Sequence, residues 1–555
     1  MKKWQIETKL KAQSSEFKIE DLVNILLENR GIKTKKEIES FLNPKLIEVT
    51  SKAVNINAVQ LKKAVFRIKT AIQEKQKIVV FGDYDVDGIC ASAILWETLN
   101  SSGADVMPYI PSRFEEGYGL SEKGIENLKS QTPNLKLIIT VDNGIVANDA
   151  VDFANKNGID VIITDHHVPT KKLPKALAIV HTTSLCGAGV AYLLSQEFKV
   201  QSSEFRVQDD THLELVVLAT IADLVPLTNA NRILVYFGLQ KLRETRRPGL
   251  LALINKTGIK KNEIGTYEIG HMLAPRLNAM GRLANAMDSL RLVCTNNQQK
   301  AENLAEVLNQ TNLERQKITQ EALSHAKNKA EEKGIKTLLF IADESYQQGI
   351  VGLVAGRMVE EYYLPSIIIS KGKEFSRASA RSVKGFNIVE FLRSASDLLI
   401  DVGGHPMAAG FTIETAKLDL LEKRLFDSAQ KLLTKEHLER ILRIDLELDP
   451  PFINNQVYSE IQKLAPFGMA NPEPTFLTKD LTISDIRTVG KDGKHLKLKF
   501  QFPSSNFQVG GIAFGIGDTH KLKAGDKVDV VYTMSENNWN NYKNIEIKIK
   551  DLRKS

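Results

Sequence analysis

The 555-residue sequence predicts an α/β protein with two lobes, a long connecting helix and a C-terminal β-barrel. Between residues 77 and 227, short apolar strands alternate with helices, which is typical of a parallel sheet covered on both faces. Residues 298–334 form a charged helical stretch that is longer than an average helix. The last part of the chain alternates with a period of two residues. The predicted segments are a helical leader (1–50), a parallel-sheet domain (51–230), a helical region with the connector (231–333), a second α/β domain (334–443) and the barrel (444–555).

The elements of the parallel-sheet domain follow from this alternation. Its strands are short, and most are rich in Ile and Val, as expected for strands buried on both faces. Gly103 follows the first helix at a position where a glycine C-cap is common. The predicted strands are 77–83, 105–110, 136–142 and 160–165, and the predicted helices are 89–103, 121–130 and 147–158.

Composition narrows the class of protein. Lys and Arg number 74 and Asp and Glu 67, so the net charge of +7 permits a polyanionic partner without requiring one. The three cysteines are far apart and form no Cys-x-x-Cys pair, which disfavours disulfides and structural zinc and favours a reducing cytoplasm. We expect no signal peptide, and no uncharged apolar run approaches the roughly 18 residues of a membrane span.

Three aspartates follow the first predicted strand in "IVVFGDYDVDGICAS": Asp83, Asp85 and Asp87. Carboxylates this close repel each other unless cations lie among them. The spacing matches the start of a calcium-binding loop, but that loop needs a Glu at its twelfth position, which is Ile94 here. A strand rather than a helix also precedes the motif, so the calcium-loop interpretation fails.

Other polar residues end neighbouring strands of the same predicted sheet. Asp142 follows one strand, and Asp165, His166 and His167 end the next, while Asp223 lies further along in "ATIADLVPL". Ligand sites gather beyond the carboxyl ends of parallel strands, so we expect the strand-end residues to converge. A single Asp after a strand is more often a helix N-cap than a ligand. Four such features together favour a metal site, and carboxylates with imidazole suit Mn²⁺ or Mg²⁺.

Four stretches in this order, "GDYDVDG", "VDNG", "DHH" and "IADLVPL", resemble the motifs of the DHH phosphoesterases. Five further stretches are similar to the RecJ family of single-strand-specific exonucleases: "LLENRGIKTKKEIESFLNP", "LAPRLNAMGRL", "SARSVKGFNI", "VGGHPMAAGF" and "LAPFGMANPEP". The resemblance spans nearly the whole chain and is specific, because the order and spacing of many motifs must coincide. It implies a DHH domain, a DHHA1 domain and an oligonucleotide-binding barrel.

The resemblance also implies phosphodiester hydrolysis with two divalent ions, Mn²⁺ or Mg²⁺. Two ions can stabilise both the attacking and the leaving oxygen of an in-line displacement. The implied metal residues are Asp142 as the bridging carboxylate, Asp85 for one ion, Asp87, His166 and Asp223 for the other, and Asp83 as a ligand or as a residue that orients one. His167 is expected to contact the scissile phosphate, and Asp165 to orient a histidine ring.

Substrate contacts are expected in both lobes. The resemblance places Arg113 and Tyr118 of the first lobe, and Arg282 of the helical region, near the substrate. In the second lobe, Arg377, Ser379 and Arg381 share one face of a predicted strand, which is either an oxyanion clamp or an exposed strand face. The stretch containing Gly403, Gly404 and His405 is predicted as a turn that either approaches a ligand or packs tightly. The resemblance favours phosphate binding in both cases.

The barrel is expected to bind single-stranded DNA. "KDGKHLKLKFQF" places Lys497 and Lys499 on one strand face, opposite apolar residues on the other. Trp539 and Tyr542 stand among asparagines in a predicted loop, where they either stack on bases or cap the open end of the barrel.

Three positions depart from the family pattern. Phe81 occupies a position where several relatives have a metal-binding histidine, and residues 229–232 replace the usual Gly-Glu-Asn-Arg. Tyr346 and Gln347 stand where the family has Trp-His, which puts one contact of the second lobe in doubt. No candidate metal-binding carboxylate is lost.

The resemblance implies a 5′→3′ exonuclease that acts on single-stranded DNA in repair and recombination. A helicase and a single-strand-binding protein are the expected partners, in the cytoplasm. Two alternatives stay open: a DHH phosphodiesterase for short oligonucleotides or cyclic dinucleotides, and a catalytically silent scaffold that binds DNA.

Overall fold

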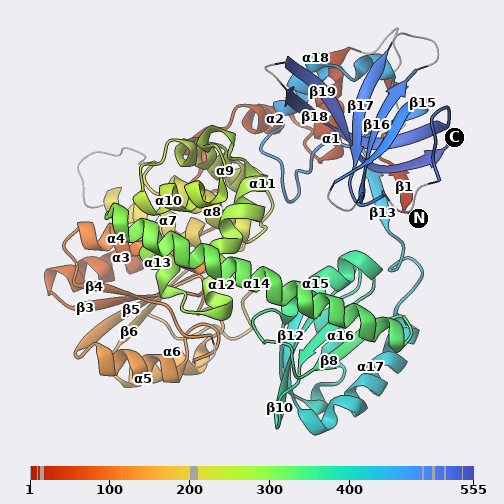
Figure 1. The fold of residues 1–555 in the computed structure, drawn as a ribbon. Coiled ribbons are helices and arrows are strands. Elements are labelled where there is room, and N and C mark those ends of the chain that lie inside the picture. The colour runs from red at the N-terminus through yellow and green to blue at the C-terminus, as the bar shows by residue number, and fades with distance from the viewer. Residues whose placement is uncertain are drawn as a thin grey trace. The chain divides into compact units, whose positions relative to one another are not determined.

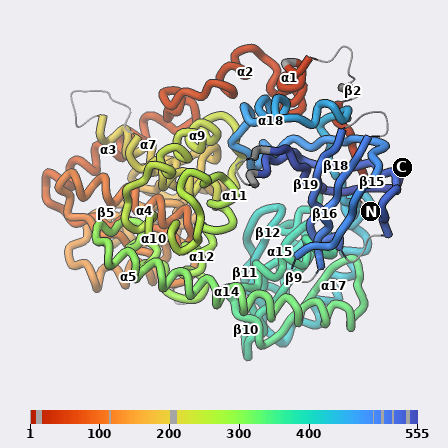
Figure 2. The backbone as a smooth tube through the Cα atoms, turned by 45° about the horizontal axis from the view of Figure 1, so that its top comes forward, coloured from red at the N-terminus to blue at the C-terminus, as the bar shows by residue number. Residues whose placement is uncertain are grey.

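The computed structural model describes residues 2–8, 11–12, 18–113, 116–200, 210–490, 493–502, 507–517, 521–539 and 542–555. The chain divides into two compact units, whose segments are found by residue number in Figures 1 and 2. The barrel unit comprises Met1–Val49, Leu224–Phe237 and Arg440–Ser555, and the cleft unit comprises Thr50–Asp223 and Gly238–Glu439. Both units therefore combine segments that are far apart in the sequence.

The first lobe of the cleft unit is a parallel sheet of five strands in the order β4-β3-β5-β6-β7. Helices α5 and α6 cover one face, where Ile125, Leu128 and Val151 join the core, and α3, α4 and α7 lie on the other (Figure 1). The strands are β3 Lys77–Phe81, β4 Val106–Tyr109, β5 Leu135–Val141, β6 Asp160–Asp165 and β7 Ala178–His181. The helices are α3 Ala58–Gln73, α4 Val86–Ser101, α5 Glu122–Gln131, α6 Asn148–Lys156 and α7 Gly187–Val200.

The predicted strands and helices of this lobe are confirmed, with small shifts at their ends. The sequence did not predict β7, which pairs in parallel with β6 at the sheet edge. Ser102 is the C-cap residue of α4, and Gly103 follows it with a φ of +80°. This left-handed conformation favours glycine, so Gly103 ends the helix one residue beyond the C-cap.

The part of the chain that links the first sheet to the second is mainly helical. The charged stretch is a single helix, α14 (Gln298–Glu332), which begins after the N-cap Asn297. Its first half packs on α10, α12 and α13, and its second half packs on α15 and β8, so the predicted connector helix is confirmed. The other helices here are α8 Leu213–Ala222, α9 Asn229–Arg243, α10 Pro248–Thr257, α11 Thr266–Glu268, α12 Ala274–Leu283 and α13 Met287–Cys294.

The second lobe of the cleft unit has a mixed sheet of five strands in the order β11-β12-β10-β9-β8. Only β8 and β9 run parallel, whereas β9, β10, β12 and β11 pair antiparallel. The strands are β8 Leu339–Asp343, β9 Ser366–Ser370, β10 Phe375–Arg381, β11 Leu399–His405 and β12 Ala408–Glu414. The helices are α15 Val351–Tyr362, α16 Ile388–Arg393 and α17 Leu418–Leu432.

The C-terminal part of the barrel unit is a closed barrel. Its five strands pair in the cyclic order β15-β16-β17-β19-β18, and β15 closes on both β16 and β18. This is the strand order of an oligonucleotide-binding fold, so the predicted barrel is confirmed. The strands are β15 Phe476–Val489, β16 His495–Gln501, β17 Gln508–Ala513, β18 Lys527–Trp539 and β19 Tyr542–Lys554. Helix α18 (Asn455–Gln462) precedes them.

The first 49 residues are only partly helical and belong to the barrel unit. Besides α1 (Ile19–Asn29) and α2 (Lys35–Leu42), they contain β1 (Lys3–Ile6) and β2 (Lys11–Ala12). β1 pairs with β13 (Ile441–Ile444) and β2 with β14 (Leu446–Leu448). The expected helical leader is therefore only partly correct, because it also contains two strands. These strands are short and polar, so the sequence did not predict them.

Arg232 anchors residues 224–237 within the barrel unit. It is 2% exposed, and its guanidinium lies 3.6 Å from the centre of the Phe41 ring. The guanidinium donates to the backbone carbonyls of Phe41 (3.0 Å), Leu464 (2.9 Å) and Ala465 (2.8 Å). The change from the family pattern at residues 229–232 therefore leaves a well-bonded arginine in place.

Two features of the composition are also visible in the structure. Cys90, Cys186 and Cys294 are free thiols, and the first two are buried. No helix among the described residues combines the length and the apolar character that crossing a membrane requires.

Candidate metal centre and substrate cleft

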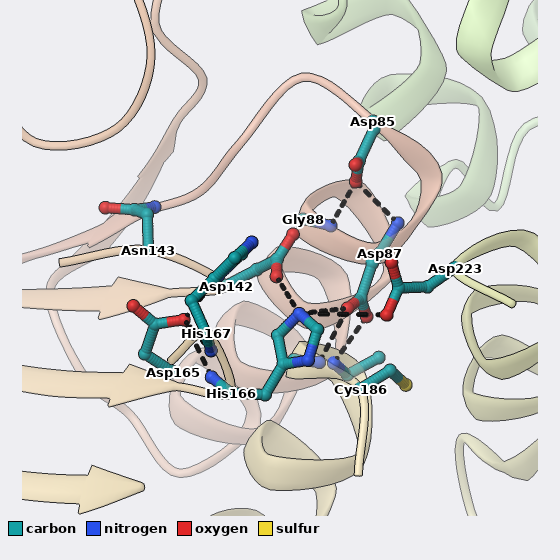
Figure 3. Close-up of polar contacts among 12 residues, drawn as sticks. Asp85, Asp87, Gly88, Asp142, Asn143, Asp165, His166, His167, Cys186 and Asp223 are labelled. Carbon is teal, nitrogen blue, oxygen red and sulfur yellow. Dashed lines mark hydrogen bonds and ion pairs between the residues drawn. The ribbon is translucent and has the colours of Figure 1, made fainter. Parts of the chain in front are cut away.

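The strand order of the first lobe places the acidic residues in one crevice. β3 and β5 are neighbours in this sheet. The chain leaves β3 towards β4 on one side and leaves β5 towards β6 on the other, so the two connections run in opposite directions. A crevice opens at such a switch point, beyond the carboxyl ends of the strands. Asp85 and Asp87 after β3, Asp142 after β5 and Asp165 at the end of β6 all lie there (Figure 3). The expected convergence is confirmed.

The first acidic loop joins β3 to α4. Asp85 is the N-cap of α4, and its Oδ1 accepts from the backbone N–H groups of Asp87 (2.9 Å) and Gly88 (3.1 Å). Asp83 is 1% exposed, and its Oδ1 has no hydrogen-bond partner among the described residues. Asp85 thus has the common N-cap role, while Asp83 presents an unpaired buried oxygen to the crevice.

Asp142 lies at the centre of the acidic group. It is 2% exposed, with a φ of +63°, and its Oδ1 lies 3.1 Å from His166 Nε2. Gly187 at the start of α7 is packed against it, because a Cβ on Gly187 would lie 2.6 Å from the Asp142 Cβ. The chain therefore holds this carboxylate in a rare backbone conformation, which is typical of functional sites.

Asp87 faces the same histidine from α4. Its carboxylate oxygens accept from the backbone N–H groups of Gly187 (2.6 Å) and Ala188 (2.7 Å) at the N-terminus of α7. The partial positive charge of a helix N-terminus stabilises an anion there. Asp87 Oδ2 is also 3.6 Å from His166 Nε2, so the aspartate is oriented by α7 towards the crevice.

His166 lies among three carboxylates from different elements (Figure 3). Its Nε2 is 3.1 Å from Asp142 Oδ1, 3.6 Å from Asp87 Oδ2 and 3.7 Å from Asp223 Oδ2. Asp223 reaches the site from the C-cap of α8. Ligand atoms that surround one small divalent cation at about 2.1 Å lie about 3 Å apart. The group therefore has the spacing of a coordination shell.

Three overlapping groups of side chains offer ligand atoms within 4.8 Å of one another. Burial, reinforced by neighbouring carboxylates, raises the pKa of Asp83, Asp85 and Asp142, and raises the pKa of Asp223 to about 8. Burial lowers the pKa of His166, which favours a neutral ring with a free lone pair. The groups are Asp83, Asp85 and Asp142; Asp87, His166 and Asp223; and Asp142, His166 and His167. These residues fit two divalent cations, since added positive charge would relieve the repulsion among buried carboxylates.

His167 has a separate environment at the edge of the crevice. Asp165 Oδ1 lies 2.8 Å from His167 Nδ1 and also accepts from the backbone N–H of His166. Burial alone would lower the pKa of His167, but the hydrogen bond and the charge of Asp165 raise it to about 9. The Tyr118 hydroxyl is 3.1 Å from Nε2, and the ring of His405 lies 6.3 Å away. Asp165 thus holds a protonated ring with Nε2 towards the cleft.

A cleft of about 730 Å³ continues from the acidic group across both lobes of the cleft unit. On β10, Arg377, Ser379 and Arg381 are more exposed than the buried residues between them, so the expected shared face is confirmed. Arg381 donates to Ser379 Oγ at 3.0 Å, and Arg377 donates to Gln348 Oε1 at 3.0 Å. All three β10 residues line the cleft.

The first lobe and α12 each contribute a further cation to the cleft. The guanidinium of Arg113 lies 5.0 Å from the centre of the Tyr84 ring. Arg282 donates to the backbone carbonyl of Gly349 at 3.1 Å. Burial and the neighbouring charges of Arg113 and Arg315 lower its pKa to about 10, which leaves it protonated at neutral pH. Arginine forks match the geometry of phosphate oxygens.

The glycine-rich stretch of the second lobe forms a hairpin. Gly403, Gly404 and His405 are the last residues of β11 and pair with β12, so the predicted turn begins only after them. Gly404 packs tightly, because a Cβ there would lie 2.3 Å from the carbonyl oxygen of Ala408. Gly403 has open space at that position and lines the cleft. Gly404 therefore fits the interpretation of tight packing, and Gly403 fits the interpretation of close approach to a ligand.

Two departures from the family pattern have structural explanations. Phe81 is fully buried in the core under α5 and α6, and its ring centre lies 5.3 Å from that of Tyr109. Tyr346 is also buried, and its hydroxyl lies 3.0 Å from His325 Nδ1 on α14. Gln347 is exposed, while the neighbouring Gln348 contacts the arginine of β10.

The barrel surface agrees in part with the sequence expectation. Along β16, Leu496, Leu498 and Phe500 are buried and Lys499 is exposed, while Lys497 pairs with Glu546. The loop predicted for Trp539 and Tyr542 is wrong, because β18 ends at Trp539, β19 begins at Tyr542, and the two residues pair. Period-two alternation is weak in "ENNWNNYKN", so the strand ends were missed. The side chains of both aromatics lie outside the described part.

Several cleft residues were not predicted from the sequence. They are Tyr84, Asn278, Gln348 and Asp401. Asn278 accepts from the backbone N–H of Val86 at 3.0 Å and so helps to hold the start of α4. It lies in "LAPRLNAMGRL", a stretch in which only Arg282 was predicted as a substrate contact. Tyr84 lies between Asp83 and Asp85 in the sequence, and this position could have indicated that it lines the cleft.

Family models match three parts of the chain. The model described as DHH family, N-terminal domain, matches residues 77–220, the DHHA1 domain matches residues 333–431, and the RecJ OB domain matches residues 444–551. The three matches coincide with the first lobe, the second lobe and the barrel.

Curated proteins and solved structures match over almost the full length. The single-stranded-DNA-specific exonuclease RecJ of Bacillus subtilis is 36% identical over 566 residues, covering 99% of this chain and 70% of that protein. The Haemophilus influenzae protein of the same name is 32% identical, covering 89% of each chain. The crystal structure of RecJ in complex with Mn²⁺ from Thermus thermophilus superposes with a TM-score of 0.83 at 29% identity, covering 100% of this chain and 80% of that one. The Mg²⁺ complex gives a TM-score of 0.76 at 27% identity.

Proposed function

The chain belongs to the RecJ family of single-stranded-DNA-specific exonucleases, and we propose that it degrades single-stranded DNA from the 5′ end with two divalent ions. The observation that carries the proposal is the crevice in which His166 faces Asp87, Asp142 and Asp223, beside the pair Asp83 and Asp85. The relatives of known structure that hold Mn²⁺ and Mg²⁺ support the choice of cation.

Each ion would have its own set of side chains. Asp83 and Asp85 would hold one ion, and Asp87, His166 and Asp223 the other, with Asp142 shared between them. When bound, two divalent ions supply Lewis-acid stabilisation of the charge on the scissile phosphate and on the attacking and leaving oxygens. The bonds from the N-termini of α4 and α7 keep Asp85 and Asp87 in place for this role.

His167 would contribute by hydrogen bonding. Asp165 fixes the ring through Nδ1, so the Nε2–H group of the charged ring faces the cleft and donates to a non-bridging phosphate oxygen. In the absence of substrate, the Tyr118 hydroxyl takes that place at 3.1 Å. Hydrolysis would leave the phosphate on the 5′ side of each released nucleotide.

Direction would come from the arginine clamp, which we define as Arg113, Ser379 and Arg381. These residues line the same cleft as Asp83 and Asp85. A terminal 5′-phosphate carries more charge than an internal phosphodiester, so a site with two guanidiniums favours the strand end. Arg377 and Arg282 extend the positive charge along the cleft, and Gly403, Gly404 and His405 also line it, on the same sheet as Arg377.

We further propose that the barrel holds the strand through Lys499 on β16. In this fold, the faces of the second and third strands and the loop between the fourth and fifth bind oligonucleotides. Trp539 ends the fourth barrel strand and Tyr542 begins the fifth, which supports their assignment to strand binding. Family membership also suggests cytoplasmic work in DNA repair and recombination, with a helicase and a single-strand-binding protein as partners.

Digestion of several substrates in the presence of Mn²⁺ tests the proposal. We expect a long single strand labelled at its 5′ end to lose the label early, and one labelled at its 3′ end to lose it last. A matched duplex should be resistant. Preferential cleavage of dinucleotides would favour the small-substrate phosphodiesterase, and binding without cleavage would favour the silent scaffold.

A further inference from the structure

Helix α12 packs directly against the acidic loop. A Cβ on Gly281 would lie 2.4 Å from the carbonyl oxygen of Tyr84, and Tyr84 is the residue between the candidate metal ligands Asp83 and Asp85 in the sequence. Real Cβ contacts essentially never fall below 3.0 Å, so only glycine permits this approach. The Asn278 side chain, one turn earlier, accepts from the backbone N–H of Val86 at 3.0 Å. Backbone and side-chain contacts therefore fix α12 relative to the loop.

The next residue of α12, Arg282, packs equally closely against the second lobe. A Cβ on Gly349 would lie 2.1 Å from the carbonyl oxygen of Arg282, the residue that follows Gly281. Arg282 returns a hydrogen bond from its guanidinium to the carbonyl of Gly349 at 3.1 Å. The backbone of α12 thus contacts the backbone of the acidic loop at Gly281 and the backbone of the second lobe at Arg282.

The chain then continues from Gly349 to the arginine clamp. Three residues further, Gly352 lies near the start of α15, and a Cβ there would be 3.1 Å from both Ser379 Oγ and Arg381 Nη2. The contacts form a continuous series from Tyr84 through Gly281, Arg282 and Gly349 to Gly352. The series begins at the acidic loop and ends at the clamp.

We propose that Gly281, Gly349 and Gly352 form a spacer that fixes the distance between the metal centre and the arginine clamp. The inference rests on the proposed function, in which the terminal 5′-phosphate occupies the clamp and the scissile phosphate lies at the metal centre. The number of nucleotides between these two phosphates then depends on the spacer. Gly281, Gly349 and Gly352 thereby determine the length of the product that each cleavage releases.

The physical basis is the direct backbone contact from Tyr84 to Gly349, after which Gly352 touches the side chains of the clamp itself. Flexible side chains between the lobes would allow the clamp to shift by an ångström or more at little cost. Backbone atoms in direct contact resist such a shift, because packed interiors transmit displacement. A methyl group at Gly281 or Gly349 has to push the two lobes apart, since the atom that it meets is backbone.

The test uses the full-length protein, Mn²⁺ and a 5′-phosphorylated single strand of defined sequence. Products are sized by high-resolution electrophoresis and mass spectrometry for the parent and for Gly281→Ala, Gly349→Ala and Gly352→Ala. Gly356→Ala is the matched control, because it lies on the same helix as Gly352 and nothing lies within 4 Å of its Cβ position. Binding of Mn²⁺ is measured separately by electron paramagnetic resonance, and folding by circular dichroism.

We expect the parent and Gly356→Ala to release products of one length. Gly281→Ala and Gly349→Ala should release mixed lengths and discriminate less between 5′-phosphate and 5′-hydroxyl ends, with Mn²⁺ binding retained. Folded variants that release the same product length with the same end preference as the parent would overturn the spacer. Gly352→Ala keeps the test decisive if the other two do not fold, because its neighbours are the mobile ends of side chains. It should broaden the product lengths, and an unchanged pattern would refute the proposal.

Failure of the spacer is distinguishable from failure of the proposed function. If the chain is not a single-strand exonuclease, the parent releases no short products under any of these conditions. If only the spacer is wrong, the parent is active and the glycine variants resemble it.

Discussion

The carboxylate of Asp87 accepts a hydrogen bond from the backbone N–H of Gly187 at 2.6 Å, and a second from Ala188. One side chain thereby caps α7 and also faces His166 across the candidate metal site. Asp223 faces the same histidine but sits at the C-cap of α8, where no helix N-terminus offers it N–H donors. The two aspartates should therefore differ in what they contribute to the metal-free protein.

The first prediction compares Asp87→Ala with Asp223→Ala in the presence of a chelator. Asp87→Ala leaves two N–H groups of α7 without their acceptor and should lower the free energy of unfolding by about 2 kcal/mol. Asp223→Ala removes a carboxyl whose pKa burial raises to about 8, so it should be neutral or stabilising. Denaturant titration of both variants measures the difference. Equal destabilisation would contradict the assigned capping role.

The second prediction concerns the terminal phosphate. Arg381→Ala should reduce the preference for 5′-phosphorylated over 5′-hydroxyl strands by roughly 10- to 100-fold, since a charge-assisted hydrogen bond contributes about 1.5–3 kcal/mol. Competition assays with the two strands measure the preference. Arg393→Ala is the control, because Arg393 pairs with Glu390 on an exposed face of α16. A variant that discriminates as strongly as the parent means that the clamp is misassigned.

The third prediction is a pH dependence of stability at Glu97. Burial alone would raise the pKa of this carboxyl, but bonds from Arg247 and His212 lower it to about 2. The unfolded carboxyl titrates near 4.5, so its stabilisation of about 3 kcal/mol is complete above that pH and is lost as the pH falls towards 2. Glu97→Gln should flatten this part of the stability curve between pH 5 and about 3. A curve parallel to that of the parent would refute the assignment.

The fourth prediction addresses the barrel. Deleting residues 444–555 would remove the partners of β2 and Arg232, so a point variant is the better probe. Lys499→Gln should weaken binding of long single strands and lower its salt dependence, because one phosphate contact is lost. Short strands should be cut as before. Lys423→Gln on α17 removes the same charge from the second lobe and should leave both properties unchanged.

Much of the fold could be predicted from the sequence, because the spacing of apolar residues indicates which faces of each helix and strand are buried. The strands of the first lobe are continuous apolar runs, and the connector helix is long and charged, so both were predicted with nearly correct bounds. β7 and the two strands near the N-terminus were missed, since "AIVH", "KWQI" and "KA" are too short to show a period. The pairing of residues 1–49 with the C-terminal region depends on contacts that no local pattern encodes.

The candidate metal residues could be predicted because the chemistry requires acids at strand ends. The orientation of those acids could not. Nothing in "DVDG" indicates that Asp87 accepts from the N-terminus of α7, a hundred residues later in the chain. The sequence also does not reveal the close packing of Gly281 on Tyr84. Both residues lie in motifs in which other residues, the aspartates and Arg282, were predicted as site residues.

The binding of Mn²⁺ by Asp142→Ala, measured beside its nuclease activity, tests the central claim most directly. In the proposed arrangement Asp142 is shared by both ion sites, because it is grouped with Asp83 and Asp85 and also lies 3.1 Å from His166. The variant should therefore lose Mn²⁺ from both sites and retain no more than a few per cent of the activity on single-stranded DNA. Asp149→Ala, an exposed aspartate in the first turn of α6, should bind and cleave like the parent. A folded Asp142→Ala protein that still binds two Mn²⁺ ions, or that cleaves at more than a few per cent of the parental rate, would contradict the two-ion account.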